Sequence, residues 1–290
     1  MTTPTQLNPD DLDWIHYEQT ITDIESENQT QIGVFGESAH TLTKRVARTL
    51  LEKQSATGDP SLRRAHDHTA VQQEVPLLIE LSQSSAQWAD LLDFHLNWKS
   101  SGRKGGSEHV VYADHGYYFK ANFKTQDRTW NDYLDRTRIY NNLFPELAYE
   151  VLGMTRVRER NDYPAFISKQ IEVVGQSGEC IAEIQALAAK AAAQNLGEDL
   201  DTAYYQTRRE HENQFREKVA VAMKEKGGTP STTLDAYVFD GFTVSDARPA
   251  NVLLGEDDEL YFIDVNIGPN TGSEVHLYKQ KQLAFDKLMS

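Results

Sequence analysis

The sequence predicts an α+β fold, because segments of helical periodicity and short hairpin-forming segments occupy different parts of the chain. Residues 1–100 carry apolar side chains at helical spacing, and residues 179–226 form a second helical block. Short apolar runs joined by glycine-containing turns lie between these regions and after them, and they indicate β-hairpins. We therefore expect a helical region, a β-rich region, a helical block and further hairpins, in that order.

The composition limits the class of protein. The chain has 290 residues, enough for one large domain or for a small and a medium one. Its 39% of hydrophobic residues can build a sizeable core. The formal charge of −15 argues against a non-specific nucleic-acid coat, although a local basic cleft could still hold a phosphate.

The sequence gives no reason to expect a membrane or secreted protein. No apolar run approaches the roughly 20 residues needed to span a bilayer, and the N-terminus lacks the features of a secretory signal. Cys180 is the single cysteine, so an internal disulfide is impossible. His66 and His68 do not share a helix face, and we expect no metal site there. A cytoplasmic location is the expectation.

Residues 1–100 are expected to form a helical accessory region. Apolar side chains recur at helical spacing from Leu42, from Val71 and from Trp88. Pro76 interrupts the second of these stretches. The polar, basic and glycine-rich segment 99–107 then predicts a linker or mobile loop.

After this segment the apolar period changes from that of a helix to that of a strand. Residues 110–123 predict a hairpin with its turn near Gly116. A helix is expected next, ending at Pro145. Its apolar face would carry Tyr133, Thr137, Tyr140 and Phe144. Residues 165–174 predict a strand that ends at Gly175.

The helical block at 179–226 predicts two apolar faces and is ended by Gly227, Gly228 and Pro230. One face would carry Ile181, Ile184, Leu187 and Ala191, and the other Phe215, Val219, Ala222 and Met223. Beyond the block, 237–244 predicts a hairpin turning at Asp240-Gly241. Residues 252–263 predict a second hairpin.

The residues best suited to chemistry surround this last hairpin. Asp246 and Asn251 bracket a short loop that contains Pro249, and Asp264 follows a hydrophobic strand. Transfer of a phosphoryl group from ATP needs magnesium, for which one or two carboxylates and an amide oxygen suffice as protein ligands. A further carboxylate can orient the attacking hydroxyl and accept its proton. The hairpin is expected to fold Asp264 back beside Asn251.

An upstream set of residues fits the same chemistry. Gly105, Gly106 and Ser107 precede a strand, as a turn that covers phosphates would, although a flexible linker is the alternative for such glycines. Lys120 lies on the following strand, spaced like the lysine that contacts the α- and β-phosphates in kinases.

These motifs resemble a known family. From about 105 to 268 the sequence is similar to the serine/threonine/tyrosine-kinase-like domain found in polyvalent proteins of phages and mobile elements. The motifs that carry the resemblance are Gly-Gly-Ser-Glu-His-Val-Val-Tyr at 105–112, Lys120, Asp-Tyr-Leu-Asp-Arg at 132–136, Asn-Leu-Phe at 142–144, Ser-Lys-Gln at 168–170, Ser-Asp-Ala-Arg-Pro-Ala-Asn at 245–251 and Phe-Ile-Asp-Val at 262–265. The last two are the most specific, and they are also similar to the phosphate loops of aminoglycoside and choline-type kinases.

The resemblance implies a reduced two-lobed protein-kinase-like fold with ATP and Mg²⁺ bound between its lobes. The kinase-like domain would span 101–290, with a first lobe at 105–175 and a reduced second lobe at 176–290. Asp246 would be the base or orienting residue, and Asn251 and Asp264 would be magnesium ligands. The nucleotide would be bound by Gly105, Gly106, Ser107, Lys120, Lys169 and Gln170.

The sequence also departs from the kinase pattern. The residues before and at the base are Val-Ser-Asp instead of His-Arg-Asp, and Val-Asn follows Asp264 instead of Phe-Gly. The segment from Asp264 to Ser290 is too short for a long activation segment, so we do not expect switching by its phosphorylation. The acid that pairs with Lys120 would be Asp132 or Asp135, with Asp132 favoured. His109 either touches the nucleotide or is a structural histidine.

The leading functional hypothesis is an ATP- and Mg-dependent phosphotransferase, with a protein hydroxyl as the favoured acceptor and a small-molecule hydroxyl as a variant. One alternative is a nucleotide-binding pseudokinase or partner-binding module, with residues 1–100 as the docking surface. Another alternative is transfer of AMP on the same fold. The set of Lys120, Asp246, Asn251 and Asp264 is complete, which favours an active enzyme.

Overall fold

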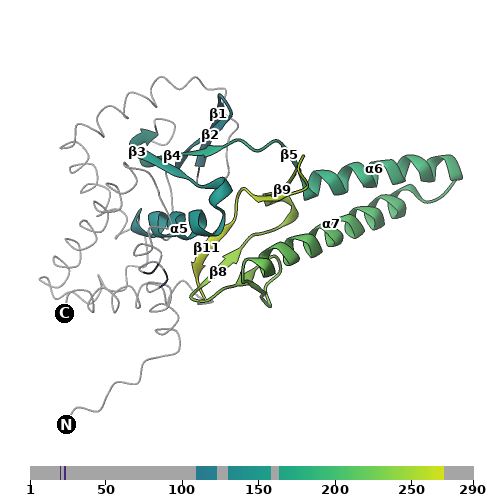
Figure 1. The fold of residues 1–290 in the computed structure, drawn as a ribbon. Helices are drawn as coiled ribbons and strands as arrows, with labels where there is room; N and C mark the ends of the chain where they lie inside the picture. The colour runs from purple at the N-terminus through teal and green to yellow at the C-terminus, as the bar shows by residue number, and fades with distance from the viewer. Residues whose placement is uncertain (1–19, 21–22, 24–108, 123–129, 158–162, 271–290) are drawn as a thin grey trace, which may run out of the picture. The chain divides into compact units, whose positions relative to one another are not determined.

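The computed structural model describes Thr20, Asp23 and residues 109–122, 130–157 and 163–270 (Figure 1). The chain divides into two compact units. The β-sheet unit comprises Ile21–Glu172 and Ser273–Gln282, and the helical-hairpin unit comprises Met1–Thr20, Val173–Gly272 and Leu283–Ser290. The helices expected within 1–100, and the predicted phosphate turn at Gly105, Gly106 and Ser107, lie outside the described residues.

The β-sheet unit contains a four-stranded antiparallel sheet in the order β1-β2-β4-β3. Its strands are β1 (His109–Asp114), β2 (Tyr117–Asn122), β3 (Glu150–Val157) and β4 (Tyr163–Ile171). The predicted hairpin is confirmed as β1 and β2, whose turn residues His115 and Gly116 both have positive φ, at 47° and 79°. Positive φ at both turn positions matches the right-handed twist of the strands that they join.

Strand β3 is not among the strands predicted from the sequence. Its residues Glu150, Gly153 and Arg156 interrupt the alternation of apolar and polar side chains that identifies a half-buried strand. The register also shifts between Val151 and Gly153. An irregularity of this kind inserts an extra residue and breaks the period-two pattern.

Helix α5 (Trp130–Leu143) covers one face of this sheet. The predicted apolar face is confirmed, because Tyr133, Thr137, Tyr140 and Phe144 are all buried. Tyr133 stacks on Phe166 of β4, with ring centroids 5.9 Å apart. As predicted, the helix ends before Pro145, which opens the short 3-10 helix η1 (Pro145–Leu147).

The helical-hairpin unit opens with β5 (Gly175–Ser177), followed by the antiparallel helices α6 (Gly178–Leu196) and α7 (Leu200–Glu225). The Ser177 side chain caps α6 by accepting a hydrogen bond from the Cys180 N–H at 3.1 Å. Gly197, with a φ of 70°, ends that helix in the left-handed conformation. The predicted helical block is therefore confirmed as two helices.

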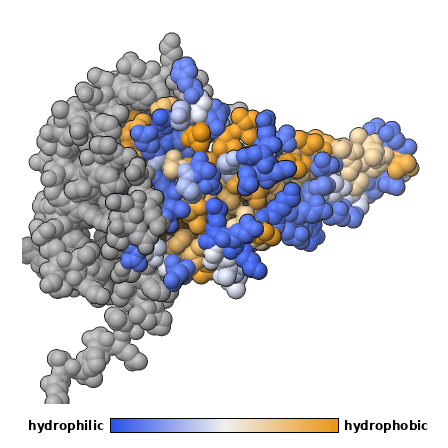
Figure 2. Space-filling view, in the orientation of Figure 1, coloured by the Kyte–Doolittle hydropathy of each residue, from blue (hydrophilic) through white to orange (hydrophobic). Residues whose placement is uncertain are grey.

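The packing face of α6 differs from the one predicted. Ile184 and Leu187 were expected to pack, yet they are 47% and 53% exposed, whereas Ala182, Ala186 and Ala193 are buried. Small side chains let the two helices approach closely, and periodicity alone does not distinguish an alanine face from an isoleucine–leucine face. Figure 2 shows hydrophobic surface along α6, while α7 is mostly hydrophilic. On α7 the prediction is confirmed for Phe215, Val219 and Met223, which are buried.

Short strands complete this unit in two sheets, of order β10-β9-β5 and β11-β8-β7-β6. The strands are β6 (Thr229–Pro230), β7 (Tyr237–Val238), β8 (Phe242–Ser245), β9 (Val252–Gly255), β10 (Leu260–Phe262) and β11 (Asn266–Pro269). Both predicted hairpins are confirmed, as β7–β8 and β9–β10. Their core includes Val244, Ala247, Val252, Phe262 and Ile267. Among the described residues, no helix combines the length and the apolar character needed to cross a bilayer.

The contact between Gly178 and Phe215 generates a stability prediction. A Cβ atom added at Gly178 would collide with the Phe215 ring. We expect Gly178→Ala to destabilise the protein by about 1–3 kcal/mol, the usual effect of overpacking. In a Phe215→Ala background the same substitution should add little, because the colliding ring is gone. Urea unfolding of the four proteins measures both effects, and equal effects in the two backgrounds would contradict the contact.

The cap of α7 generates a prediction about pH. The Asp199 carboxylate accepts hydrogen bonds from the N–H groups of Asp201 and Thr202 and from the Thr202 hydroxyl, and these bonds hold its pKa below the ordinary value. The stabilisation is therefore present at neutral pH and is lost as the pH falls through the folded-state pKa. Asp199→Asn keeps an accepting cap without a titrating charge. We expect the stability advantage of the wild type over Asp199→Asn to disappear on acidification, as measured by urea unfolding across the pH range.

Candidate active site

Two main-chain connections bring Asp246, Asn251 and Asp264 together. At one end Ser245 of β8 pairs with Asn266 of β11. At the other end the Ile263 N–H donates to the Asn251 carbonyl at 3.0 Å. The loop at 246–250 and the segment 264–265 are therefore bounded by the same two connections. This arrangement confirms the expectation that the hairpin folds Asp264 back beside Asn251.

Asn251 is fixed at the end of this loop. It is the last residue of the 3-10 helix η3 (Pro249–Asn251) and is only 6% exposed. Its side-chain Nδ2 donates to the Asp246 carbonyl at 2.9 Å, and its main-chain N–H donates to the Arg248 carbonyl at 2.9 Å. Because the donor end of the amide binds the loop, the oxygen Oδ1 is the end available to a cation.

Asp246 has a backbone conformation that is uncommon for residues other than glycine. Its φ is 60°, in the left-handed region, which Asp tolerates better than most residues. Its carboxylate is partly exposed, and Oδ1 lies 3.2 Å from Arg248 Nε. Arg248 is therefore a site residue not predicted from the sequence. Its position two residues after Asp246 is the feature of the sequence that could have indicated it.

The donor set fits a magnesium ion. Asp264 is exposed, so its carboxylate can reach a ligand, and the Asn251 amide and Asp246 carboxylate are held in the same loop. The described parts of the chain contain no cluster of three or more His, Cys, Asp or Glu side chains suited to a metal. Mg²⁺ does not require such a cluster, because it keeps several waters and is bound through one or two carboxylates together with substrate phosphates.

Lys120 lies on β2, the second strand of the sheet in the other unit. Its Nζ donates to the Tyr149 hydroxyl at 2.8 Å and lies 4.8 Å from the centre of that ring. Asn141 of α5 holds Tyr149 in place, because its amide group bonds both the N–H and the carbonyl of Tyr149 at 2.8 Å. Tyr149 is thus a partner of Lys120 that was not predicted from the sequence.

The face of the sheet that carries Lys120 is polar and buried against α5. Lys120 pairs with Ser168, whose hydroxyl accepts a hydrogen bond from the Tyr133 hydroxyl at 3.3 Å. Burial raises the pKa of Tyr133, so this phenol stays protonated at neutral pH. Gln170 lies on the same face, and its Nε2 donates to the Tyr140 hydroxyl at 3.1 Å and to the Leu147 carbonyl at 2.9 Å.

Lys169 lies on the opposite face of the sheet from Lys120 and Gln170, because neighbouring residues of a strand alternate between faces. Its Nζ lies 3.7 Å from Glu150 Oε2 and 4.1 Å from the centre of the Tyr117 ring. The structure therefore groups Lys120 with Gln170, whose amide nitrogen bonds α5 and η1, and it separates both from Lys169.

Three other predicted residues have defined places. His109 is the first residue of β1 and pairs with Asn122. Asp132 lies in the first turn of α5, where only its backbone is described. Asp135 lies in the same helix and is 2% exposed. Lys120 belongs to the β-sheet unit, whereas Asp246, Asn251 and Asp264 belong to the helical-hairpin unit.

The helices and antiparallel sheets of the described residues define an α+β protein. Residues 72–186 match the family described as Serine/Threonine/Tyrosine Kinase found in polyvalent proteins. The resemblance predicted from the sequence is thereby confirmed for this segment of the chain. The match supports a kinase-like phosphotransferase. Comparison with curated proteins and with solved structures found no match.

The extent of the match differs from the extent of the resemblance predicted from the sequence. The match begins at 72, within the region interpreted as an accessory module, and it includes Lys120, Lys169 and Gln170. It ends at 186, in α6, before the loop that holds Asp246 and Asn251. The functional assignment of that loop therefore rests on its own geometry.

The left-handed conformation of Asp246 generates a prediction. An alanine at a φ near 60° is strained by roughly 1 kcal/mol, whereas glycine is not. We expect Asp246→Gly to be more stable than Asp246→Ala by about 1 kcal/mol. At Ala250, within η3, the order should reverse, with the wild-type alanine more stable than Ala250→Gly by about 0.5–1 kcal/mol. Equilibrium unfolding of the four proteins gives both comparisons, and the same order at both positions would contradict the loop geometry.

Proposed function

We propose that this protein transfers the γ-phosphoryl group of ATP to a hydroxyl group, with Mg²⁺ as the cofactor. The convergence of Asp246, Asn251 and Asp264 at the two main-chain connections is the observation that carries the proposal. The proposal is supported by the residue types at this loop, which are two aspartates and an asparagine whose Nδ2 donates to the Asp246 carbonyl. The kinase family match, which lies mainly in the other unit, is independent support.

Each residue has a defined part in the proposed reaction. Asn251 and Asp264 would hold Mg²⁺, which supplies neutralisation of charge on the phosphates. Asp246 orients the acceptor hydroxyl and takes its proton as the oxygen bonds to the γ-phosphorus. The bond from that phosphorus to the β–γ bridging oxygen breaks, and ADP leaves with its electron pair. For Lys120 we retain the expectation from the sequence that it contacts the α- and β-phosphates.

The structure gives physical reasons why these residues suit their parts. Arg248 lies beside the Asp246 carboxylate, with its Nε 3.2 Å from Oδ1. Asn251 is buried and bonded within the loop, so little conformational entropy is lost when its oxygen binds a cation. The Tyr149 hydroxyl is a neutral acceptor that bonds the Lys120 ammonium at 2.8 Å.

The metal assignment is tested by thermal unfolding with ATP, with and without magnesium. Ligand at about 100 times its dissociation constant stabilises the native state by roughly 2.7 kcal/mol. We expect Asp264→Ala to lose the magnesium-dependent part of that shift. Glu256→Ala, in the turn between β9 and β10, removes the same charge from a nearby exposed site and should keep it. Equal shifts in Asp264→Ala and the wild type would remove Asp264 from the metal site.

The role of Asp246 is tested with Asp246→Asn, which keeps the size and tolerates the left-handed backbone. Because the variant cannot accept a proton, we expect transfer from radiolabelled ATP to fall by about 10²- to 10⁴-fold. The Mg-ATP thermal shift should be retained. Intact-mass analysis identifies phosphate or AMP as the transferred group. Binding without transfer in the wild type would instead favour the pseudokinase or partner-binding module.

A further inference from the structure

A partly buried ion pair of the helical-hairpin unit lies next to the loop that carries Asp246. Arg216 of α7 donates from Nε to Asp235 Oδ1 at 3.0 Å. The Asp235 side chain is only 13% exposed and that of Arg216 is 27% exposed. A charge pair that is largely removed from water is screened little by salt and holds a defined geometry.

Asp235 is connected directly to the loop. Its main-chain carbonyl accepts a hydrogen bond from the Ala247 N–H at 2.9 Å. Ala247 is the residue after Asp246 and is fully buried. The peptide group that follows Asp246 is therefore fixed by Asp235, while the Asp246 carbonyl is held by Asn251 Nδ2 at 2.9 Å.

Both aspartates have backbones that need support. Asp235 has a φ of 56° and Asp246 a φ of 60°, and each such conformation carries strain that persists only where its surroundings fix it. For Asp235 the side-chain bond to Arg216 supplies that fixation. Loss of the ion pair would free Asp235 to relax, and its carbonyl would move relative to Ala247.

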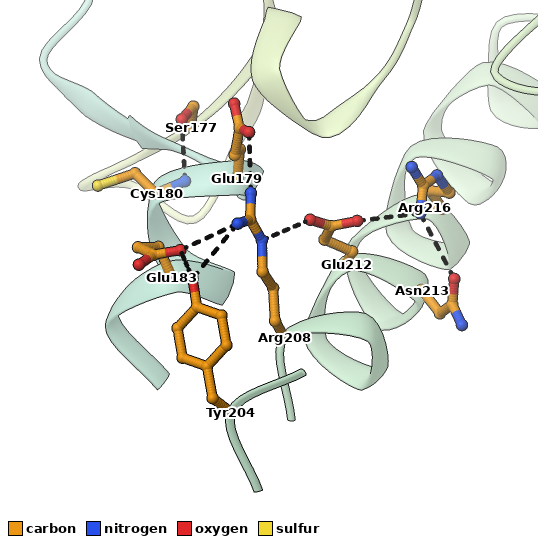
Figure 3. Close-up of polar contacts among 9 residues, drawn as sticks. All are labelled: Ser177, Glu179, Cys180, Glu183, Tyr204, Arg208, Glu212, Asn213 and Arg216. Atoms are coloured by element: carbon orange, nitrogen blue, oxygen red, sulfur yellow. Dashed lines mark hydrogen bonds and ion pairs between the residues drawn. The ribbon is translucent and has the colours of Figure 1, made fainter. Parts of the chain in front are cut away.

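Arg216 is itself held at one end of a row of charges along α6 and α7, as Figure 3 shows for all members except Asp235. It contacts Glu212 at 3.6 Å and Asn213 at 3.4 Å, and Glu212 accepts a bond from Arg208 at 3.1 Å. Arg208 also pairs with Glu179 at 3.0 Å and Glu183 at 3.2 Å, both on α6. The two helices thus orient Arg216 toward Asp235.

We propose that Arg216 and Asp235 are positioning residues that hold the Asp246 loop in its reactive geometry. The inference rests on the proposed phosphotransfer function. Neither residue touches the reacting atoms in this scheme; Arg216 acts on Asp235, and Asp235 acts through the main chain of Ala247. A displacement of about 1 Å in a reacting group can lower a rate by about 100-fold, so a small movement of this loop matters.

The experiment compares Arg216→Gln, Asp235→Asn and the rescue variant Arg216→Lys with a matched control, Arg209→Gln. Arg209 lies on an exposed part of α7 and loses the same charge on substitution. Two kinds of measurement are made on the full chain. Hydrogen exchange of the segment containing Ala247 reports the loop itself. Transfer from radiolabelled ATP to water or to the protein's own hydroxyls gives kcat, and KM for Mg-ATP.

The expected result is specific to a positioning role. In Arg216→Gln and Asp235→Asn the Ala247 segment exchanges faster, kcat falls about 10- to 100-fold and KM for Mg-ATP stays within about 2-fold. Arg216→Lys recovers part of the rate because lysine restores the charge without the planar geometry of arginine. Arg209→Gln behaves as the wild type.

Other results overturn the proposal. Unchanged exchange at Ala247 would show that the ion pair does not hold the loop. Faster exchange with an unchanged kcat would show that the loop position does not govern transfer. A parallel loss of Mg-ATP binding and thermal stability would indicate a purely structural pair. Failure of the wild type to bind Mg-ATP or transfer phosphate would instead refute the proposed function. The exchange data would still show whether the Arg216–Asp235 ion pair holds the loop.

Discussion

The main-chain connection between Asn251 and Ile263 is the constraint on which the candidate site depends. It joins the end of the Asp246 loop to the end of β10, and the pairing of Ser245 with Asn266 closes the same region at its other side. Main-chain bonds do not depend on rotamers, so the relative placement of the three site residues is fixed by the fold. Two side chains add contacts to Asp246. Asn251 donates to its carbonyl, and Arg248 lies beside its carboxylate.

The same loop shows how a folded structure maintains strained backbone at a site. Asp246 occupies the left-handed region, and so does Asp235, whose carbonyl holds the following peptide. Two buried residues that follow Asp246, Ala247 and Pro249, keep the loop from relaxing toward solvent. Strain of this kind is retained where surrounding contacts outweigh it, and it is often found where a reactive group must be presented in one orientation.

In the β-sheet unit a neutral partner fixes the lysine. Kinases commonly pair this residue with a glutamate, and aspartates of α5 were expected to replace it. The structure shows the Tyr149 hydroxyl 2.8 Å from Lys120 Nζ, and Asn141 holds Tyr149 in place. The sequence did not indicate Tyr149, because the partner of Lys120 was expected on the helix. Tyr149 follows the helix, after the turn at Pro145.

The sequence by itself determined the local elements whose patterns are strong, namely the β1–β2, β7–β8 and β9–β10 hairpins, the α5 face and the ends of the helical block. Turn residues and periodicity depend on a few neighbouring residues, so they can be recognised from the sequence alone. It also predicted Asp246, Asn251 and Asp264 as site residues by type and spacing. Only the tertiary structure decided that α6 packs through alanines, that Lys169 and Lys120 lie on opposite faces, and that Arg216, Asp235 and Arg248 surround the loop. The physical reason is that these features depend on strand register, helix approach and contacts between distant residues, which no local pattern encodes.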